Sequence, residues 1–106
     1  MSFAGQVVCI TGASYGIGAE LARQYARAGA RLALAARSLD RLQAVVAECR
    51  ALGADAIGVR TDVTEEAACR AFIDATVAHF GHLDILVNNA GLGASGNFRD
   101  MTDLSV

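Results

Sequence analysis

The sequence predicts an α/β fold with three layers, in which a doubly wound parallel sheet lies between helices. Three observations support this prediction. Short apolar runs alternate along the chain with longer segments of helical periodicity. The runs are apolar on successive residues, a pattern typical of parallel strands buried on both faces. A glycine-rich turn joins the first run to the first helical segment.

The strands are expected at residues 7–10, 32–36, 56–59 and 83–87. The segments between them have apolar residues three and four apart, as a helix that covers one face of a sheet requires. These residues are Ile17, Leu21 and Tyr25; then Leu39, Leu42, Val45, Val46 and Cys49; then Ile73, Val77 and Phe80. The predicted order is therefore β-α-β-α-β-α-β.

Glycines and a threonine mark the predicted helix boundaries. Gly29, Gly53 and Gly81 each follow a helical segment, where a left-handed residue closes the last turn. Thr64 precedes two glutamates, so we expect its hydroxyl to cap the third helix. Residues 1–90 form the predicted core of one domain, and residues 91–106 form a glycine-rich continuation. The fourth strand has only one neighbour within this part of the fold.

Length and composition restrict the class of protein. A chain of 106 residues with 54% hydrophobic and 6% aromatic residues can bury an aliphatic core in one domain. The net charge of -2 argues against a nucleic-acid partner. No apolar run approaches the roughly 20 residues that span a bilayer, and residues 1–6 lack a basic cluster. We expect a cytoplasmic protein with no membrane partner.

The cysteines indicate a reducing compartment. Cys9, Cys49 and Cys69 are odd in number, far apart, and without a Cys-x-x-Cys pair. Each lies in an apolar strand or helical pattern, so free and buried thiols are expected. No metal site is predicted.

The loop between the first strand and the first helix is the strongest candidate site. Its glycines have the spacing Gly-x-x-x-Gly-x-Gly and allow a ligand to approach the backbone closely. The following helix offers unpaired N–H groups and a partial positive charge, which together suit a pyrophosphate. The alternative is a tight turn with close strand-to-helix packing. The candidate cofactor-binding residues here are Gly12, Ser14, Tyr15, Gly16, Ile17 and Gly18.

The end of the second strand is where a dinucleotide site binds the adenosine ribose, roughly 20 residues beyond the glycines. Ala36 and Arg37 stand there, a small neutral residue and a cation that suit a 2′-phosphate. The Ser14 hydroxyl can donate to the same phosphate. The alternative is a solvated Arg37 at the start of a helix. Arg41, one turn further on, can assist at the same phosphate, but we expect it to be simply exposed.

Two further strand ends have polar residues suited to the same ligand. Asp62, followed by Val63, can accept a hydrogen bond from an adenine amino group, or it can serve only as a turn carboxylate. Asn88 and Asn89 precede Ala90 and Gly91. The glycine allows a ribose to lie close to the backbone, or the four residues can form only a turn.

Two groups of basic residues are predicted to have structural roles only. His79 and His82 flank a glycine at a helix end, where we expect them to contact the last carbonyls. The repeat of Arg23, Arg27 and Arg31 near Glu20 predicts a solvated helix face.

The motifs together resemble the short-chain dehydrogenase/reductase family over nearly the whole chain. This resemblance implies a Rossmann-type domain that binds NADP(H) in preference to NAD(H), with Arg37 selecting NADP. It implies that Thr11 and Asn89 connect the sheet near the site. Asp62 and Val63 would hold adenine, and Asn88, Ala90 and Gly91 would line the adenosine and nicotinamide side.

The family's catalytic Asn, Ser and Tyr-x-x-x-Lys have no counterpart in this sequence, which contains no lysine. Tyr15 and Tyr25 occupy the glycine loop and the first helix, so neither matches the family's tyrosine. We therefore expect the cofactor-binding half of an oxidoreductase, inactive by itself, with residues 91–106 beginning the substrate-side loop. The complete protein would act on a carbonyl or alcohol and form a homo-oligomer. The alternatives are an NADP-binding regulatory module and a nonfunctional fragment.

Overall fold

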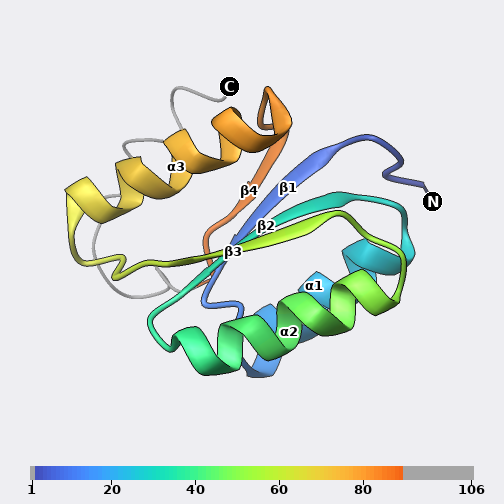
Figure 1. Cartoon of the computed structure of the whole chain (residues 1–106), viewed down its shortest axis with the longest axis horizontal. Helices are drawn as coiled ribbons and strands as arrows, with labels where there is room; N and C mark the ends of the chain where they lie inside the picture. Colours follow the sequence, from blue (N-terminus) through green and yellow to red (C-terminus); the bar gives the residue numbers. More distant parts are fainter. Residues whose placement is uncertain (1, 90–106) are drawn as a thin grey trace.

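The computed structural model describes residues 2–89, which form a parallel sheet with helices on both faces (Figure 1). The strand order is β3-β2-β1-β4. The strands are β1 (Val7–Thr11), β2 (Arg31–Ala36), β3 (Ala56–Arg60) and β4 (Ile85–Val87); the helices are α1 (Gly16–Arg27), α2 (Leu39–Ala51) and α3 (Glu66–Phe80). The predicted fold class and element order are confirmed.

The sheet is buried on both faces because its central strands are apolar at every position. Figure 1 shows α1 and α2 together on one face and α3 on the other. Val8 and Ile10 of β1 point into the cluster with α1 and α2, whereas Val7 and Cys9 point into the cluster with α3. One strand therefore supplies both hydrophobic cores, as its continuous apolar run predicted.

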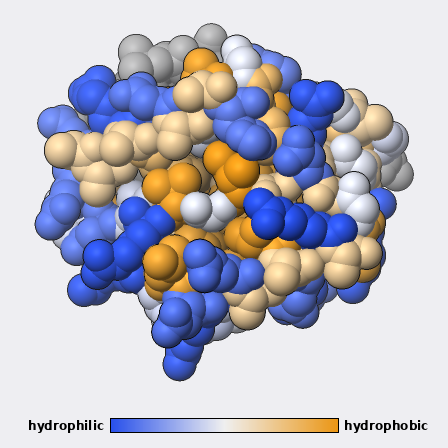
Figure 2. Space-filling view, viewed as in Figure 1, coloured by the Kyte–Doolittle hydropathy of each residue, from blue (hydrophilic) through white to orange (hydrophobic). Residues whose placement is uncertain are grey.

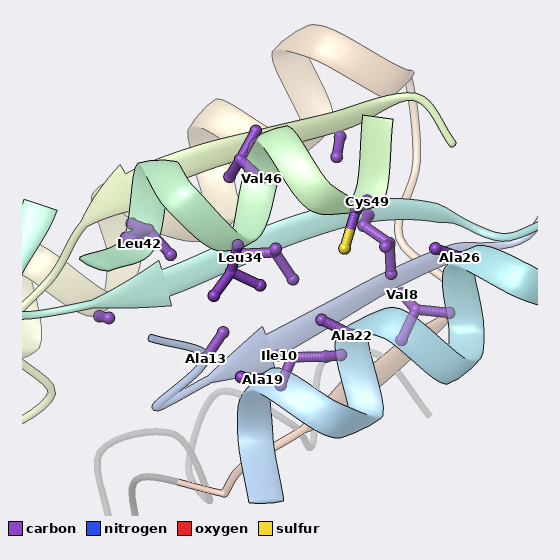
Figure 3. Close-up of a cluster of buried hydrophobic side chains, with 14 of the residues drawn as sticks. Val8, Ile10, Ala13, Ala19, Ala22, Ala26, Leu34, Leu42, Val46 and Cys49 are labelled. Atoms are coloured by element: carbon purple, nitrogen blue, oxygen red, sulfur yellow. The ribbon is translucent and has the colours of Figure 1, made fainter. Parts of the chain in front are cut away.

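Alanines let α1 lie close to the sheet. Ala19, Ala22 and Ala26 form its buried side and pack toward Val8 and Ile10 (Figure 3). The larger buried side chains among these helices come from α2, which contributes Leu42, Val45, Val46 and Cys49, while Leu21 and Tyr25 of α1 pack only partly against the cluster. The small residues on α1 thus bring its first turn next to the end of β1.

The β3 edge of the sheet remains accessible among the described residues. Figure 2 shows apolar surface across the middle of this face, over the β3 edge and surrounded by hydrophilic residues. Gly58 and Arg60 of β3 are exposed, while Ile57 and Val59 pack against the core on the α3 side. The charged Arg60 at the end of the strand disfavours pairing with another chain's edge.

The predicted helix ends are confirmed. Gly29, Gly53 and Gly81 have φ values of 91°, 98° and 88°, the left-handed conformation that glycine adopts without a Cβ penalty. Their N–H groups donate to carbonyls of the preceding turn, at 2.7 Å for Gly81 to Val77. Each glycine therefore satisfies one carbonyl of the last helical turn.

The prediction that Thr64 caps α3 was wrong. Glu65 holds the N-cap position, and no side chain bonds the first turn there. The Thr64 hydroxyl instead donates to the Asp62 carboxylate over 2.6 Å, and its N–H donates to the same oxygen over 3.0 Å. A local turn around Asp62 thus competes successfully with the helix cap for this hydroxyl.

The histidine prediction also needs correction. His79 and His82 lie near carboxylates rather than helix-terminal carbonyls, with Nε2 at 3.6 Å from Asp55 and at 2.9 Å from Asp84, respectively. Both contacts are at the end of the sheet opposite the glycine loop. Sequence reasoning missed the first contact because Asp55 precedes β3 and meets His79 of α3 only in the fold. The second contact is local, because Asp84 lies two residues after His82.

The arginine prediction is confirmed for α1. Arg23 lies 3.2 Å from Glu20 and 3.2 Å from Glu48 of α2, and Arg27 lies 4.0 Å from Glu20. Hydrogen bonds from Gln24 and Arg23 lower the pKa of Glu20 below its ordinary value. These exposed pairs cover the seam between α1 and α2 and contribute little stability individually.

All three cysteines are free and buried, as predicted. Burial raises the pKa of Cys9 to about 11, against a smaller lowering by its contact with Thr76. Burial also raises the pKa values of Cys49 and Cys69. The thiols are therefore protonated core groups at neutral pH. Within residues 2–89, no helix has the length and apolar character needed to cross a bilayer.

We predict that Asp84 fixes the start of β4 against β1. Its carboxylate accepts the Val7 N–H at 2.7 Å, and its own N–H donates to the Val7 carbonyl at 3.0 Å. Because Val7 is fully buried, Asp84→Ala leaves its N–H unsatisfied and should lower the free energy of unfolding by about 1–3 kcal/mol. Urea denaturation measures this loss. Asp84→Asn keeps an acceptor and should lose less; equal losses in both variants would contradict the assigned role.

Candidate functional site

The carboxyl ends of the four strands surround one crevice. Its volume is about 660 Å³. The lining comes from the glycine loop, the segment after β2, the segment after β3 and one residue after β4: Gly12, Ser14, Tyr15, Gly16, Ile17, Ala36, Arg37, Ser38, Thr61, Asp62, Val63, Thr64 and Asn89. All four predicted motifs therefore contribute to the walls of the same crevice.

The glycine loop presents the uncapped start of α1 to this crevice. Gly12 and Gly16 have φ values of 65° and 63°, so the loop depends on residues without a Cβ. Tyr15 is the N-cap residue, but its side chain makes no capping hydrogen bond, and the first turn of α1 has no acidic residue. The helix N-terminus is thus available to an anion, with its partial positive charge uncompensated by the first turn.

Gly18 lies behind the loop, where a side chain would have no room. A Cβ there would collide with the Gly12 carbonyl and approach the Asn89 Nδ2 atom to 2.9 Å. The same Nδ2 atom donates to the Gly12 carbonyl oxygen over 3.3 Å. The Gly12 carbonyl, just after β1, therefore contacts both the first turn of α1 and the residue Asn89 after β4.

Thr11 makes a second connection between β1 and β4. Its fully buried hydroxyl lies 3.2 Å from the Asn88 Oδ1 atom and 3.5 Å from the Val87 carbonyl oxygen. Asn88 therefore faces β1, and the structure places Asn89 rather than Asn88 on the crevice wall. Two consecutive asparagines thus have different environments. Ala90 and Gly91 lie outside the described residues.

Arg37 follows the end of β2 and lines the crevice together with the glycine loop. Ala36 before it is only 5% exposed and uncharged, so no carboxylate precedes the guanidinium at this strand end. The Ala35 carbonyl accepts the Ala13 N–H over 3.1 Å, which fixes the glycine loop against β2. Arg37 and the glycine loop are thereby held at the ends of adjacent strands.

Arg60, which sequence reasoning did not select, supports Arg37. Its Nε atom donates to the Arg37 carbonyl oxygen over 3.2 Å. Both side chains line a cavity of about 220 Å³ together with Asp62, Glu65 and Ala68. The only hint in the sequence was the position of Arg60, two residues before Asp62 at the end of the third strand. Its relevance depends on β2 and β3 being neighbours.

Asp62 is an anion at the end of β3. The hydrogen bonds from the Thr64 hydroxyl and N–H lower the pKa of its carboxyl, and Arg37 and Arg60 lower it further. Because the folded-state pKa is depressed, this group stabilises the fold above its unfolded pKa and loses that contribution as the pH falls. At neutral pH, Asp62 is a hydrogen-bond acceptor beside Val63, which packs partly against the α3 core.

The fold and the crevice define a class of nucleotide-binding α/β proteins. Three features agree: the order β3-β2-β1-β4, a glycine turn opening α1, and polar residues at successive carboxyl ends. Residues 6–106 match the family model described as short chain dehydrogenase. The chain belongs to the short chain dehydrogenase family.

Individual relatives agree with this assignment. The chain is 50% identical over 102 residues to "11-beta-hydroxysteroid dehydrogenase-like 4A" of Arabidopsis thaliana, covering 95% of this chain and 34% of that protein. It is 49% identical to "11-beta-hydroxysteroid dehydrogenase" of Pinus massoniana, again over 95% of this chain but 29% of the relative. The chain thus spans about a third of the length of these curated relatives.

Solved structures show the same fold. A hydroxysteroid dehydrogenase from Escherichia coli aligns with a TM-score of 0.80 and 38% identity, over 82% of this chain and 37% of that one. A short chain dehydrogenase/reductase from Burkholderia phymatum, solved in complex with NAD, aligns with a TM-score of 0.78 and 41% identity. That alignment covers 81% of this chain and 31% of the other.

We predict that Gly18→Ala disrupts the crevice. The added Cβ must separate the start of α1 from Gly12 and Asn89, and such overpacking costs about 1–3 kcal/mol. Denaturation should show this loss, and titration by nicotinamide fluorescence should show weakened NADPH binding. Gly53→Ala is the control, because its positive φ imposes backbone strain far from the crevice with open space around the Cβ. Unchanged affinity in a folded Gly18→Ala chain would contradict the prediction.

Proposed function

We propose that this chain forms the cofactor-binding part of an NADP-dependent oxidoreductase that interconverts an alcohol and a carbonyl. The observation on which this rests is a single crevice that combines the uncapped N-terminus of α1 with the guanidinium of Arg37. The reaction class is taken from the short chain dehydrogenase family, and the cofactor is proposed from the residues that line the crevice.

Different residues of the crevice fit the successive parts of an NADP(H) molecule. The glycine loop and the first turn of α1 suit the pyrophosphate, because backbone N–H groups and the helix dipole face it. Arg37 and Ser14 suit a 2′-phosphate, since Ala36 leaves space and adds no negative charge. Asp62 and Val63 suit adenine, through an anionic acceptor and an apolar contact. When bound, the nicotinamide supplies or accepts the hydride.

The proposed role of these residues is to bind and orient the cofactor. Asn89 helps to position the wall by bonding the Gly12 carbonyl, and Thr11 holds β4 beside β1. Proton transfer to the substrate oxygen needs a group poised near working pH. The chain has no lysine, so the pair that the family uses for this step is not formed by these residues. The predictions of a homo-oligomer and a cytoplasmic location stay predictions.

Arg37 should determine cofactor selectivity. A charge-assisted hydrogen bond is worth roughly 1.5–3 kcal/mol, so Arg37→Ala should weaken NADPH binding by about 10- to 150-fold. NADH affinity should remain nearly unchanged, because NADH lacks the 2′-phosphate. Arg31→Ala is a matched control, since Arg31 is exposed at the opposite end of β2. Equal affinities for NADPH and NADH in the unmutated chain would contradict the proposed selectivity.

We also predict that the 106-residue chain binds NADPH without turning over carbonyl substrates. Binding should survive because the glycine loop, Arg37 and Asp62 share one crevice, whereas the proton donor pair is lacking. NADPH consumption should be measured with a panel of aldehydes and ketones, using an active short-chain dehydrogenase as the assay control. Carbonyl-dependent turnover that is lost on mutation of one of these 106 residues would refute this prediction. Binding without turnover would also be the behaviour of a regulatory module.

A further inference from the structure

The outer edge of β3 has backbone groups that the pairing with β2 does not use, because β3 is the outermost strand on its side of the sheet. Leu32 of β2 lies opposite Ala56, and its N–H donates to the Asp55 carbonyl over 2.8 Å. In a parallel ladder, this pattern directs the N–H and carbonyl groups of every second β3 residue away from β2: Ala56, Gly58 and Arg60. Such a row of groups is a template for a strand of another molecule.

A side chain of α2 occupies the first of these outward carbonyls. The Nε atom of Arg50 donates to the Ala56 carbonyl oxygen over 2.9 Å, in a partly buried position. The Ala56 side chain is fully buried, so the guanidinium lies where β3 enters the core. An incoming strand would have to displace this guanidinium before it could pair with the beginning of β3.

Close packing of α2 on β3 holds Arg50 within reach of that carbonyl. Gly58 lies so near α2 that a Cβ there would be 2.9 Å from the Val46 Cγ2 atom and 3.2 Å from the Leu42 Cγ atom. Arg50 is in the last turn of the same helix. The packing of the helix on the strand therefore fixes the backbone from which the guanidinium extends.

The rest of the outer edge is short and favours association. Gly58 is exposed and has no side chain that could cover its backbone. Figure 2 shows apolar surface over this edge, and burial of such surface against another molecule is favourable. At the far end, the Arg60 Nε atom donates to the Arg37 carbonyl and not to an outward group of β3. Protection of the outward carbonyls thus depends on Arg50 more than on Arg60.

We infer that Arg50 protects the outer edge of β3 from pairing with a second copy of this chain. An antiparallel pair centred on Gly58 would place Ala56 of each copy opposite Arg60 of the other, which keeps like charges apart. Both Arg50 side chains would first have to leave their carbonyls. This inference is independent of the proposed function, because the crevice lies at the other end of α2, beside Ser38.

The test compares the self-association of the unmutated chain with that of Arg50 variants, by sedimentation velocity over a range of concentrations. Arg50→Ala removes the donor and should shift the monomer–dimer equilibrium toward the dimer by about 10-fold or more, because a hydrogen bond to a charged group is worth at least roughly 1.5 kcal/mol. Arg50→Met keeps a long apolar stem without the donor and should associate similarly. Arg50→Lys keeps a charged donor and should associate much less than either.

Amide hydrogen exchange identifies the surface that pairs. In Arg50→Ala, the outward N–H groups of Ala56, Gly58 and Arg60 should gain protection as the concentration rises. The N–H groups of Ile57 and Val59 face β2 and should not change. Circular dichroism and urea denaturation check that each variant is folded. Arg70→Ala is the charge control, since Arg70 is exposed on α3, and it should associate as the unmutated chain does.

Concentration-dependent protection of the outward amides in folded Arg50→Ala or Arg50→Met would support the inference. If neither variant associates more than the unmutated chain, the bond to Ala56 only connects α2 to β3 and the inference is overturned. It is also overturned if association accompanies loss of the fold, if protection appears away from β3, or if Arg50→Lys associates as strongly as Arg50→Ala.

Discussion

The carbonyl group of Gly12 is the point on which the geometry of the crevice depends. Gly18 packs against it with no space for a Cβ, and the Asn89 side chain donates a hydrogen bond to its oxygen. The first contact sets the distance between β1 and α1, and the second sets the position of the chain after β4. A change in either would move the uncapped start of α1 relative to the walls that face it.

The two hydrophobic cores explain why this point is held so closely. The alanines of α1 let the helix lie against β1, and the larger side chains of α2 fill the rest of that layer. On the other face, Phe72 and Phe80 of α3 pack against Val7 and Cys9 of the same strand. Packing on both faces therefore holds β1 in place, and the groups that make the polar contacts at its end are held with it.

The fold could be predicted from sequence because its determinants are local. Continuous apolar runs specify buried strands, and glycines after helical segments specify their ends, as the positive φ values of Gly29, Gly53 and Gly81 confirm. Thr64 was assigned wrongly because Asp62, two residues earlier, competes for the same hydroxyl. Arg60 was missed because its contact with Arg37 requires β2 and β3 to be adjacent.

The distribution of charge around the crevice resolves an apparent conflict between Asp62 and an anionic ligand. Thr64 donates two hydrogen bonds to one oxygen of Asp62, while Arg37 at the end of the neighbouring strand β2 and Arg60 at the end of β3 favour its ionised form. The field of this carboxylate is therefore partly compensated before any ligand enters. The same compensation reduces what Arg37 and Arg60 can offer to an anionic ligand, because part of their charge already balances Asp62.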